Sequence, residues 1–331
     1  GIDHLGEQRS AVCCLSSLNL DTWDEWQDHP LFIEDVMRFL DNVLQDFIDK
    51  APDSMARAKY AAARERSVGL GVMGFHSFLQ AKGVPFESVI AKVWNRKIFR
   101  HIRTQADAAS QALAHERGAC PDAADYGIME RFSNKIAIAP TASISVIAGN
   151  ASPGIEPIAA NVFVQKTLSG SFTVRSKALR DVLAAHGRDN EETWTGITVS
   201  KGSVQHLDFL TQQEKDVFKT AFELDQRWVV EHAADRAPFI CQAQSVNLFL
   251  PANVHKRDLH QIHLLAWKKG VKSLYYCRSL SIQRADTVSE KVQPLEIMLA
   301  KQPAANDSAE APVPVAAAAN ATNYEECLAC Q

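Results

Sequence analysis

The sequence has no long apolar run and little net charge. No window approaches the roughly 18 consecutive apolar residues that a membrane-spanning helix needs, and residues 1–30 lack the basic start and apolar core of a secretory signal. Lys and Arg number 35 against 39 Asp and Glu, a formal net charge of −4. The chain therefore has no basic field that would attract a nucleic acid backbone. We expect a cytoplasmic protein that binds neither membrane nor nucleic acid.

Cysteine is also scarce, and its seven positions are uneven. Cys13 and Cys14 are adjacent, and the chain closes on a CxxC formed by Cys327 and Cys330. An odd number of scattered cysteines predicts no disulfide framework in a reducing cytosol, so thiol chemistry or burial has to explain them. The chain begins with Gly1 instead of Met and enters apolar sequence almost at once. We therefore expect a fragment of a longer protein.

What the sequence does have is the composition of a globular protein. Its 331 residues are 46% hydrophobic, enough for one large domain or two smaller ones, and no internal repeat recurs. Apolar residues at helical spacing alternate with short runs of strand character, which favours an α/β fold. Glycines at 69, 71 and 74 indicate close approach of backbones. Helices are expected over residues 31–50, 93–118, 212–235 and 256–269, and strands over 11–20, 135–139, 161–168 and 195–199.

The composition changes after about residue 285. Of the twenty residues 303–322, nine are Ala and three are Pro. Such a segment buries too little apolar surface to offset its ordering entropy. We therefore expect a domain over residues 1–285 and a flexible tail over 286–331. The CxxC at the end of this tail lacks the further ligands of a zinc site. It suits thiol–disulfide exchange, although a chance pair of exposed cysteines is the alternative.

The segment 138–157 is a candidate anion site. A predicted strand ends at Pro140, and Thr141, Ala142, Ser143, Ile144 and Ser145 follow where a helix would begin. Unpaired backbone N–H groups at such a position, with hydroxyl side chains nearby, suit a phosphate group. The alternative is an ordinary helix N-cap made by Thr141 or Ser143, because the segment is neither a Walker loop nor a GxGxxG motif.

Tyr275 and Tyr276 are adjacent in a chain with only five tyrosines. In a regular strand their rings would point to opposite faces. If the strand ends there, the rings could stack, and two stacked phenols form a plausible one-electron relay.

Two further groups have simpler interpretations. Cys13 and Cys14 could be buried small side chains in a strand, or one of them could pair with a distant thiol. His255, His260 and His263 lie on one predicted helix without a carboxylate or cysteine at ligand spacing. We interpret them as surface or interface histidines and predict no metal bound by this chain.

Taken together, these features occur in one family. The chain resembles the C-terminal part of the large, catalytic subunit of class I ribonucleotide reductase. The matching stretches, in the family's order along nearly the whole chain, are AVCCLSSLNL, KIAIAPTASISVIAGNASPGIEP, QSVNLFLP, LAWKKGVKSLYYCRS and the terminal CLAC. The resemblance implies half of a ten-stranded α/β barrel followed by a flexible tail.

The resemblance also implies roles for single residues. Thr141, Ala142, Ser143 and Ile144 would hold the phosphates of a ribonucleoside diphosphate. Cys13 would be one of two cysteines that reduce the ribose. Tyr275 and Tyr276 would pass a radical from a metal-containing small subunit toward the active site. Cys327 and Cys330 would reduce the active-site disulfide again and would themselves be reduced by thioredoxin or glutaredoxin, while Cys14 matches no role.

The sequence also departs from the family's pattern. The radical cysteine of the family lies in an Asn-x-Cys-x-Glu segment just upstream of the AVC stretch, and no such segment occurs here. The redox partner of Cys13 and the regions that would bind the effectors ATP and dATP are likewise expected upstream. The chain would therefore need the remainder of the subunit to catalyse, in a homodimer of large subunits.

Three other interpretations compete with this one. An adenosylcobalamin-dependent reductase shares the phosphate segment and the CxxC, but it needs no tyrosine relay from a second subunit. A non-catalytic, nucleotide-binding half barrel would explain the absent radical cysteine. A thioredoxin-like oxidoreductase would place its CxxC at the start of a helix, not on a tail.

Overall fold

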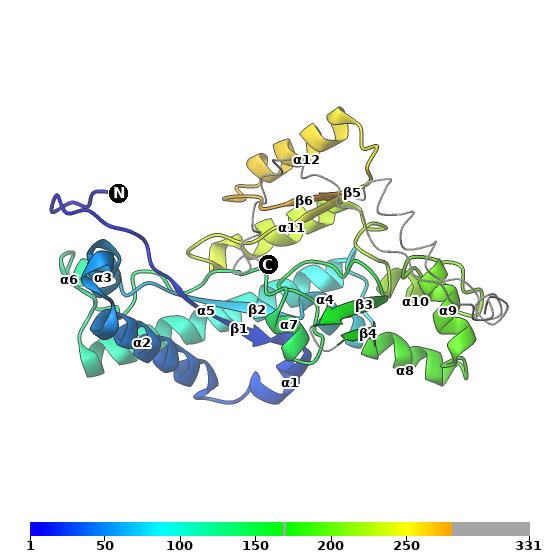
Figure 1. Cartoon of the computed structure of the whole chain (residues 1–331), viewed down its shortest axis with the longest axis horizontal. Helices are drawn as coiled ribbons and strands as arrows, with labels where there is room; N and C mark the ends of the chain where they lie inside the picture. The colour runs from blue at the N-terminus through cyan, green and yellow to red at the C-terminus, as the bar shows by residue number, and fades with distance from the viewer. Residues whose placement is uncertain (168–169, 280–331) are drawn as a thin grey trace, which may run out of the picture. The chain divides into compact units, whose positions relative to one another are not determined.

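Parallel strands form the centre of the molecule in a computed structural model that describes residues 1–167 and 170–279. Strand β1 (Cys14–Asn19) pairs with β2 (Val68–Met73) from Cys14 opposite Val68 to Asn19 opposite Met73. Strand β5 (Leu248–Leu250) pairs in parallel with β6 (Cys277–Ser279). In Figure 1, β1 and β2 lie near the label of α5, and β5 and β6 lie near those of α11 and α12.

Two further extended segments join these pairs into one parallel series. Leu70 of β2 bridges to Ile136, and Ile138 bridges to Gln244, a few residues before β5. The backbone N–H of Ala137 donates to Leu70, and that of Ser245 donates to Ile138. The order is β1, β2, 135–139, 242–250 and β6, with each segment beside the next one in sequence. This is the arrangement expected of half a ten-stranded α/β barrel.

Glycine lets the second and third segments approach closely. A Cβ added to Gly71 would lie 2.4 Å from the carbonyl oxygen of Ala137, a distance that no side chain tolerates. Strand β2 is buried along its whole length, as expected when both faces of a parallel strand are covered. The close approach predicted from the glycines is therefore confirmed.

Helices cover the strands and build the main hydrophobic core. Helix α2 (Phe32–Lys50) packs against α5 (Val89–Arg117), and the two lie side by side (Figure 1). Helix α2 buries Ile33, Met37, Leu40 and Leu44 at helical spacing. The remaining helices of this part are α1 (Trp23–Trp26), α3 (Ala56–Glu65), α4 (Phe75–Ala81), α6 (Pro121–Ala124), α7 (Ile144–Ile147), α11 (Gln226–Arg236) and α12 (Lys256–Lys268).

A second, smaller hydrophobic cluster lies beside the first. The antiparallel hairpin of β3 (Val162–Thr167) and β4 (Gly170–Arg175) is followed by α8 (Lys177–Ala185), α9 (Glu191–Val199) and α10 (Gln212–Val217). Leu179, Leu183, Trp194 and Ile197 are fully buried there. These elements gather at one end of the described chain, coloured green in Figure 1.

The structure corrects two predictions from the sequence. Residues 195–199, expected as a strand, are the last turns of α9, where Trp194 and Ile197 share a buried face at helical spacing. The helix expected over 212–235 is two helices, α10 and α11. The break occurs because Phe218, Ala221 and Leu224 are buried in a turn and Asp225 caps a new helix through the N–H of Arg227.

Most other element predictions are confirmed. Helices α2, α5 and α12 and strands β1 and β3 occur where they were expected. The expected strand over 135–139 is present as extended backbone paired only at Ile136 and Ile138. No helix among the described residues is long and apolar enough to cross a membrane. The predicted boundary at 285 and the tail over 286–331 lie outside the described residues.

Candidate functional site

The phosphate candidate follows the third segment of the parallel series. Helix α7 begins at Ile144 and lasts a single turn, and Ser143 makes no side-chain cap. In the described chain, the backbone N–H groups of Ala142, Ser143 and Ile144 donate to no acceptor. Neither Thr141 nor Ser143 caps the helix, so the alternative of an ordinary N-cap is wrong. Ser143 and Ile144 are exposed, and an anion could reach these N–H groups.

The hydroxyl of Thr141 closes the loop that follows. Its Oγ1 accepts a hydrogen bond of 2.7 Å from the backbone N–H of Gly154. Thr141 has a φ of 56°, in the left-handed region that a β-branched residue rarely adopts. The hydrogen bond joins the two ends of segment 141–154 and fixes the loop between them. A fixed loop can hold a buried residue in such a strained conformation.

Cys13 lies one residue before the first pair of β1 and β2. Its sulfur would be 3.0 Å from a Cβ on Gly69 and lies 3.8 Å from Oε1 of Gln242. Partial burial of the sulfur raises the pKa of the thiol, so it stays protonated at neutral pH. Cys13 is exposed as a residue and Cys14 is half-buried. The interpretation of both as buried small side chains is therefore wrong. All five cysteines within the described residues are free thiols.

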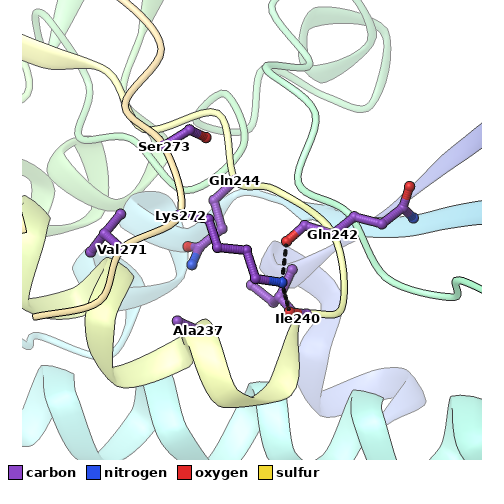
Figure 2. A pocket seen from close by; sticks show the side chains of 7 residues that line it. All are labelled: Ala237, Ile240, Gln242, Gln244, Val271, Lys272 and Ser273. Carbon is purple, nitrogen blue, oxygen red and sulfur yellow. Dashed lines mark hydrogen bonds between the residues drawn. The ribbon is translucent and has the colours of Figure 1, made fainter. Parts of the chain in front are cut away.

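A lysine that the sequence did not single out holds the segment next to Cys13. The Nζ of Lys272 donates to the carbonyl oxygens of Ile240, Cys241 and Gln242, at 3.1, 2.6 and 3.0 Å. Figure 2 shows the side chain crossing from the segment that follows α12 to this turn. The side chain of Gln242 in turn donates to the carbonyl of Val68 at 2.9 Å. Lys272 therefore connects the two segments that carry Gln242 and the tyrosine pair.

The rings of Tyr275 and Tyr276 lie together. Their centroids are 4.2 Å apart with an interplanar angle of 52°, and both side chains are about half exposed. They precede β6, so they are not part of the regular strand. The arrangement on opposite faces is therefore wrong. The rings are in contact as the alternative required, but they are tilted and not stacked.

The buried carboxylate of Glu156 lies close to this pair. It was not singled out from the sequence. Glu156 is 6% exposed, and its Oε2 accepts a hydrogen bond of 2.8 Å from Nδ2 of Asn247. Burial raises the pKa of Glu156, against the smaller opposing effects of Asn247 and Arg278. The oxygen Oδ1 of Asn247 accepts the backbone N–H of Tyr276 at 3.1 Å. A single carboxylate inside the apolar run GIEPIAA was the signal in the sequence.

The strand register explains why these groups meet. Ile138 lies opposite Gln244; Thr141 follows Ile138 by three residues, and Asn247 follows Gln244 by the same number. The phosphate segment and the tyrosine pair therefore occur at the same level of the parallel series. Cys327 and Cys330 lie outside the described residues.

Two histidines of the α12 region make hydrogen bonds within their own segment. His255 caps the helix through the N–H of Arg257, and His263 contacts the carbonyl of Leu259 at 2.8 Å. Among the described residues, no group of three or more His, Cys, Asp or Glu could hold a metal ion.

Comparisons with known proteins agree with the fold. The family described as "Ribonucleotide reductase, barrel domain" matches residues 4–126 and 122–277. The ribonucleoside-diphosphate reductase large subunit of Invertebrate iridescent virus 6 is 50% identical over 285 residues, which cover 85% of this chain and 30% of that protein. A putative large subunit from Frog virus 3 is 44% identical over 274 residues, covering 82% and 48%.

A solved structure gives the same result. The Actinobacillus ureae class Id ribonucleotide reductase alpha subunit matches with a TM-score of 0.77 and 39% sequence identity, over 84% of this chain and 52% of that one. The chain thus spans about half or less of the length of these relatives. The family match covers almost all described residues, and the parallel series has the topology of half a barrel. The chain therefore belongs to the ribonucleotide reductase family, and its described residues are part of that family's barrel domain.

Proposed function

We propose that this chain is part of the large, catalytic subunit of a class I ribonucleotide reductase, which reduces ribonucleoside diphosphates to 2′-deoxyribonucleotides. The observation that carries the proposal is the ring pair of Tyr275 and Tyr276, 4.2 Å apart and about half exposed. Tyrosine is among the few side chains that can be oxidised reversibly. Two rings in contact suit the transfer of one electron toward a radical-generating small subunit, which moves the radical in the opposite direction, into this chain.

The substrate's phosphates would bind the segment Thr141 to Ile144. Three successive N–H groups without acceptors support this assignment, because oxygen atoms of a phosphate are the acceptors that such a turn lacks. The hydrogen bond from Gly154 to Thr141 keeps the turn in place before substrate arrives. The N–H groups that would bind phosphate belong to Ala142, Ser143 and Ile144. The hydroxyl of Thr141 holds the loop closed.

Cys13 would supply part of the reducing power. Loss of the 2′-hydroxyl as water consumes two electrons and two protons, and two thiols supply both when they become a disulfide. Burial raises the pKa of the Cys13 thiol, which retains the proton that this step requires. Cys327 and Cys330 would then reduce that disulfide by exchange and be restored by thioredoxin or glutaredoxin.

The remaining parts of the proposal concern partners. No cofactor is assigned to this chain; the radical would come from a metal-containing small subunit. ATP and dATP would act as effectors on other parts of a cytoplasmic homodimer of large subunits. These assignments depend on the family membership.

The test is a Tyr275→Phe substitution in the intact large subunit that contains this chain, assayed with its small subunit. Phenylalanine preserves the ring but cannot be oxidised at this potential, so we expect turnover to fall to the background of the assay. Tyr126→Phe is the matched control, because Tyr126 is exposed and its ring lies beside that of His4. Undiminished turnover in Tyr275→Phe would remove the relay and favour a reductase that generates its radical from bound cobalamin.

A further inference from the structure

We propose that Glu156 is a positioning residue for the tyrosine pair, and that it acts through Asn247. The inference rests on the proposed function, because it concerns the tyrosines that would carry the radical. Three features of the described structure support it: an irregular pairing at Tyr275 and Tyr276, a side chain that completes this pairing, and a buried carboxylate that holds that side chain.

The tyrosine pair forms a β-bulge. Leu248 lies opposite Cys277, and its N–H donates to the carbonyl of Tyr276 at 2.9 Å. If the two strands stayed in step, the N–H of Tyr276 would donate to Val246. Instead, the N–H of Tyr275 donates to Val246, at 2.9 Å. One extra residue is therefore present in the tyrosine strand, an arrangement that is rare between parallel strands.

The bulge explains the ring contact. Successive residues of a regular strand point to opposite faces, which would separate the two phenols. The extra residue removes this alternation, and the ring centroids lie 4.2 Å apart. A bulge commonly redirects a side chain next to an active site. The ring contact thus depends on a backbone irregularity that something has to stabilise.

Asn247 stabilises the bulge through its side chain. Because of the extra residue, the N–H of Tyr276 no longer faces the carbonyl of Val246. Oδ1 of Asn247 accepts this N–H instead, at 3.1 Å. Asn247 is 1% exposed, so its amide oxygen is held at this N–H by the surrounding structure, and loss of the bond would be costly. The amide must therefore point its oxygen, and not its nitrogen, toward Tyr276.

Glu156 sets the direction of that amide. A carboxylate only accepts hydrogen bonds, so its bond of 2.8 Å with Asn247 requires Nδ2 of the amide to face Glu156. The oxygen of Asn247 then faces Tyr276. Arg278 lies 3.9 Å from the same carboxylate oxygen and is largely exposed, so Asn247 is the main partner. Glu156 follows the loop that Thr141 closes through Gly154, and the phosphate segment is thereby connected to the bulge.

The decisive experiment exchanges donor and acceptor. In Asn247→Asp, two carboxylates face each other where an amide and a carboxylate stood, and the bulge loses its fixed cap. In the double variant Asn247→Asp with Glu156→Gln, the new glutamine can donate to the new aspartate, whose other oxygen accepts the N–H of Tyr276. We expect the single change to separate the rings and the double change to bring them together again.

The readout is ¹⁹F NMR of this chain labelled with 3-fluorotyrosine, in which the five tyrosines are assigned by Tyr→Phe changes. In Asn247→Asp, we expect the resonances of Tyr275 and Tyr276 to lose their ring-contact shifts. The resonance of Tyr60, which lies on α3 and donates its hydroxyl to Asp3, should stay in place and report an intact fold. Asn95→Asp is the matched control, because Asn95 is another fully buried amide with two hydrogen bonds.

The double variant keeps the test decisive even if Asn247→Asp does not fold. If the double variant fails to restore both resonances, or if Asn247→Asp leaves them unmoved, the positioning role is wrong. Turnover of the intact enzyme is measured in parallel, and a ring displacement of about 1 Å should lower it about a hundredfold. Rings that separate without loss of turnover would instead defeat the proposed relay, so the two failures are distinguishable.

Discussion

The chain buries two carboxylates that are surrounded in opposite ways. Asp41 on α2 is 1% exposed and is bound by guanidinium groups of Arg66, Arg117 and Arg131 at 2.6 to 3.0 Å. Glu156, next to the tyrosine pair, has one neutral amide at 2.8 Å and a distant, exposed arginine. Burial alone would raise the pKa of both. The arginines, with Arg131 foremost, hold the pKa of Asp41 below its ordinary value, whereas burial prevails at Glu156.

The difference separates a structural charge from a functional one. Asp41 joins α2 to the end of α3, to the end of α5 and to the loop at 131, so its charge is compensated where helices meet. Glu156 is left with little compensation at the place where a backbone irregularity holds two aromatic rings. Uncompensated buried charges are found mostly at sites of function, and the contrast therefore predicts different responses to loss of each charge.

The largest effect is expected for Asp41→Asn. The amide keeps the size of the side chain but removes the charge, which leaves three arginines facing one another. Breaking a buried ion pair in this way costs about 3–5 kcal/mol. We expect the free energy of unfolding, measured by chemical denaturation of this chain, to fall by that amount.

Asp46→Asn is the control on the same helix. Asp46 pairs with Lys50 one turn away and is largely exposed, so water replaces the partner. A loss in Asp41→Asn no greater than in this control would remove the distinction between the two carboxylates, because Asp41 would then stabilise no more than a surface charge.

An intermediate effect is expected for Lys272→Met. Lys272 is a charged group whose hydrogen bonds go to three neutral carbonyls, two of which, those of Ile240 and Gln242, are drawn in Figure 2. Its charge is therefore compensated less than that of Asp41 and more than that of Glu156. Methionine keeps most of the apolar stem but donates nothing, and we expect a loss of about 2 kcal/mol in the free energy of unfolding.

Lys269→Met is the matched change nearby, because Lys269 pairs with Glu231 at 2.9 Å and is 43% exposed. It should cost much less than Lys272→Met. Equal losses of unfolding free energy in the two variants would mean that the hydrogen bonds from Lys272 to the carbonyls of residues 240–242 do not stabilise the fold.

The sequence predicts the local pattern well and the contacts between distant segments poorly. The spacing of Ile33, Met37, Leu40 and Leu44 is enough to place α2, because neighbours along a helix decide it. The prediction of a strand at 195–199 is wrong, because Ile197, together with Trp194 one turn before it, packs into a cluster assembled from β3, α8 and α10. Propensity carries no information about such tertiary partners.

The same limit applies to the site. Thr141, Cys13 and the tyrosines are visible as motifs, but Glu156 meets Asn247 across 91 positions of sequence, and Asp41 meets Arg131 across 90. The local pattern marks Glu156 as a carboxylate in an apolar run, but it does not reveal the partners of either carboxylate. The ring contact was left open for a similar reason: it depends on a one-residue slip between strands, which only the hydrogen bonds reveal.

The smallest effect on stability is expected for Glu156→Gln, with a change within about 1 kcal/mol at neutral pH, because glutamine keeps an oxygen for Asn247 and removes a poorly compensated charge. Its pH dependence is the sharper measurement. The pKa of Asp41 is lowered from 3.8 in the folded state, so its stabilisation is complete above that value and disappears as pH falls through the folded pKa.

The pKa of Glu156 is raised from 4.5, so its ionised form opposes folding at pH values above the folded pKa, and this cost vanishes below 4.5. Relative to the unaltered chain, Asp41→Asn should therefore be less stable and Glu156→Gln slightly more stable at neutral pH, and both differences should shrink on acidification. Denaturation from pH 3 to 8 measures the two difference curves. Curves of the same sign would show that the two carboxylates are compensated alike, and Glu156 would then be one more structural charge.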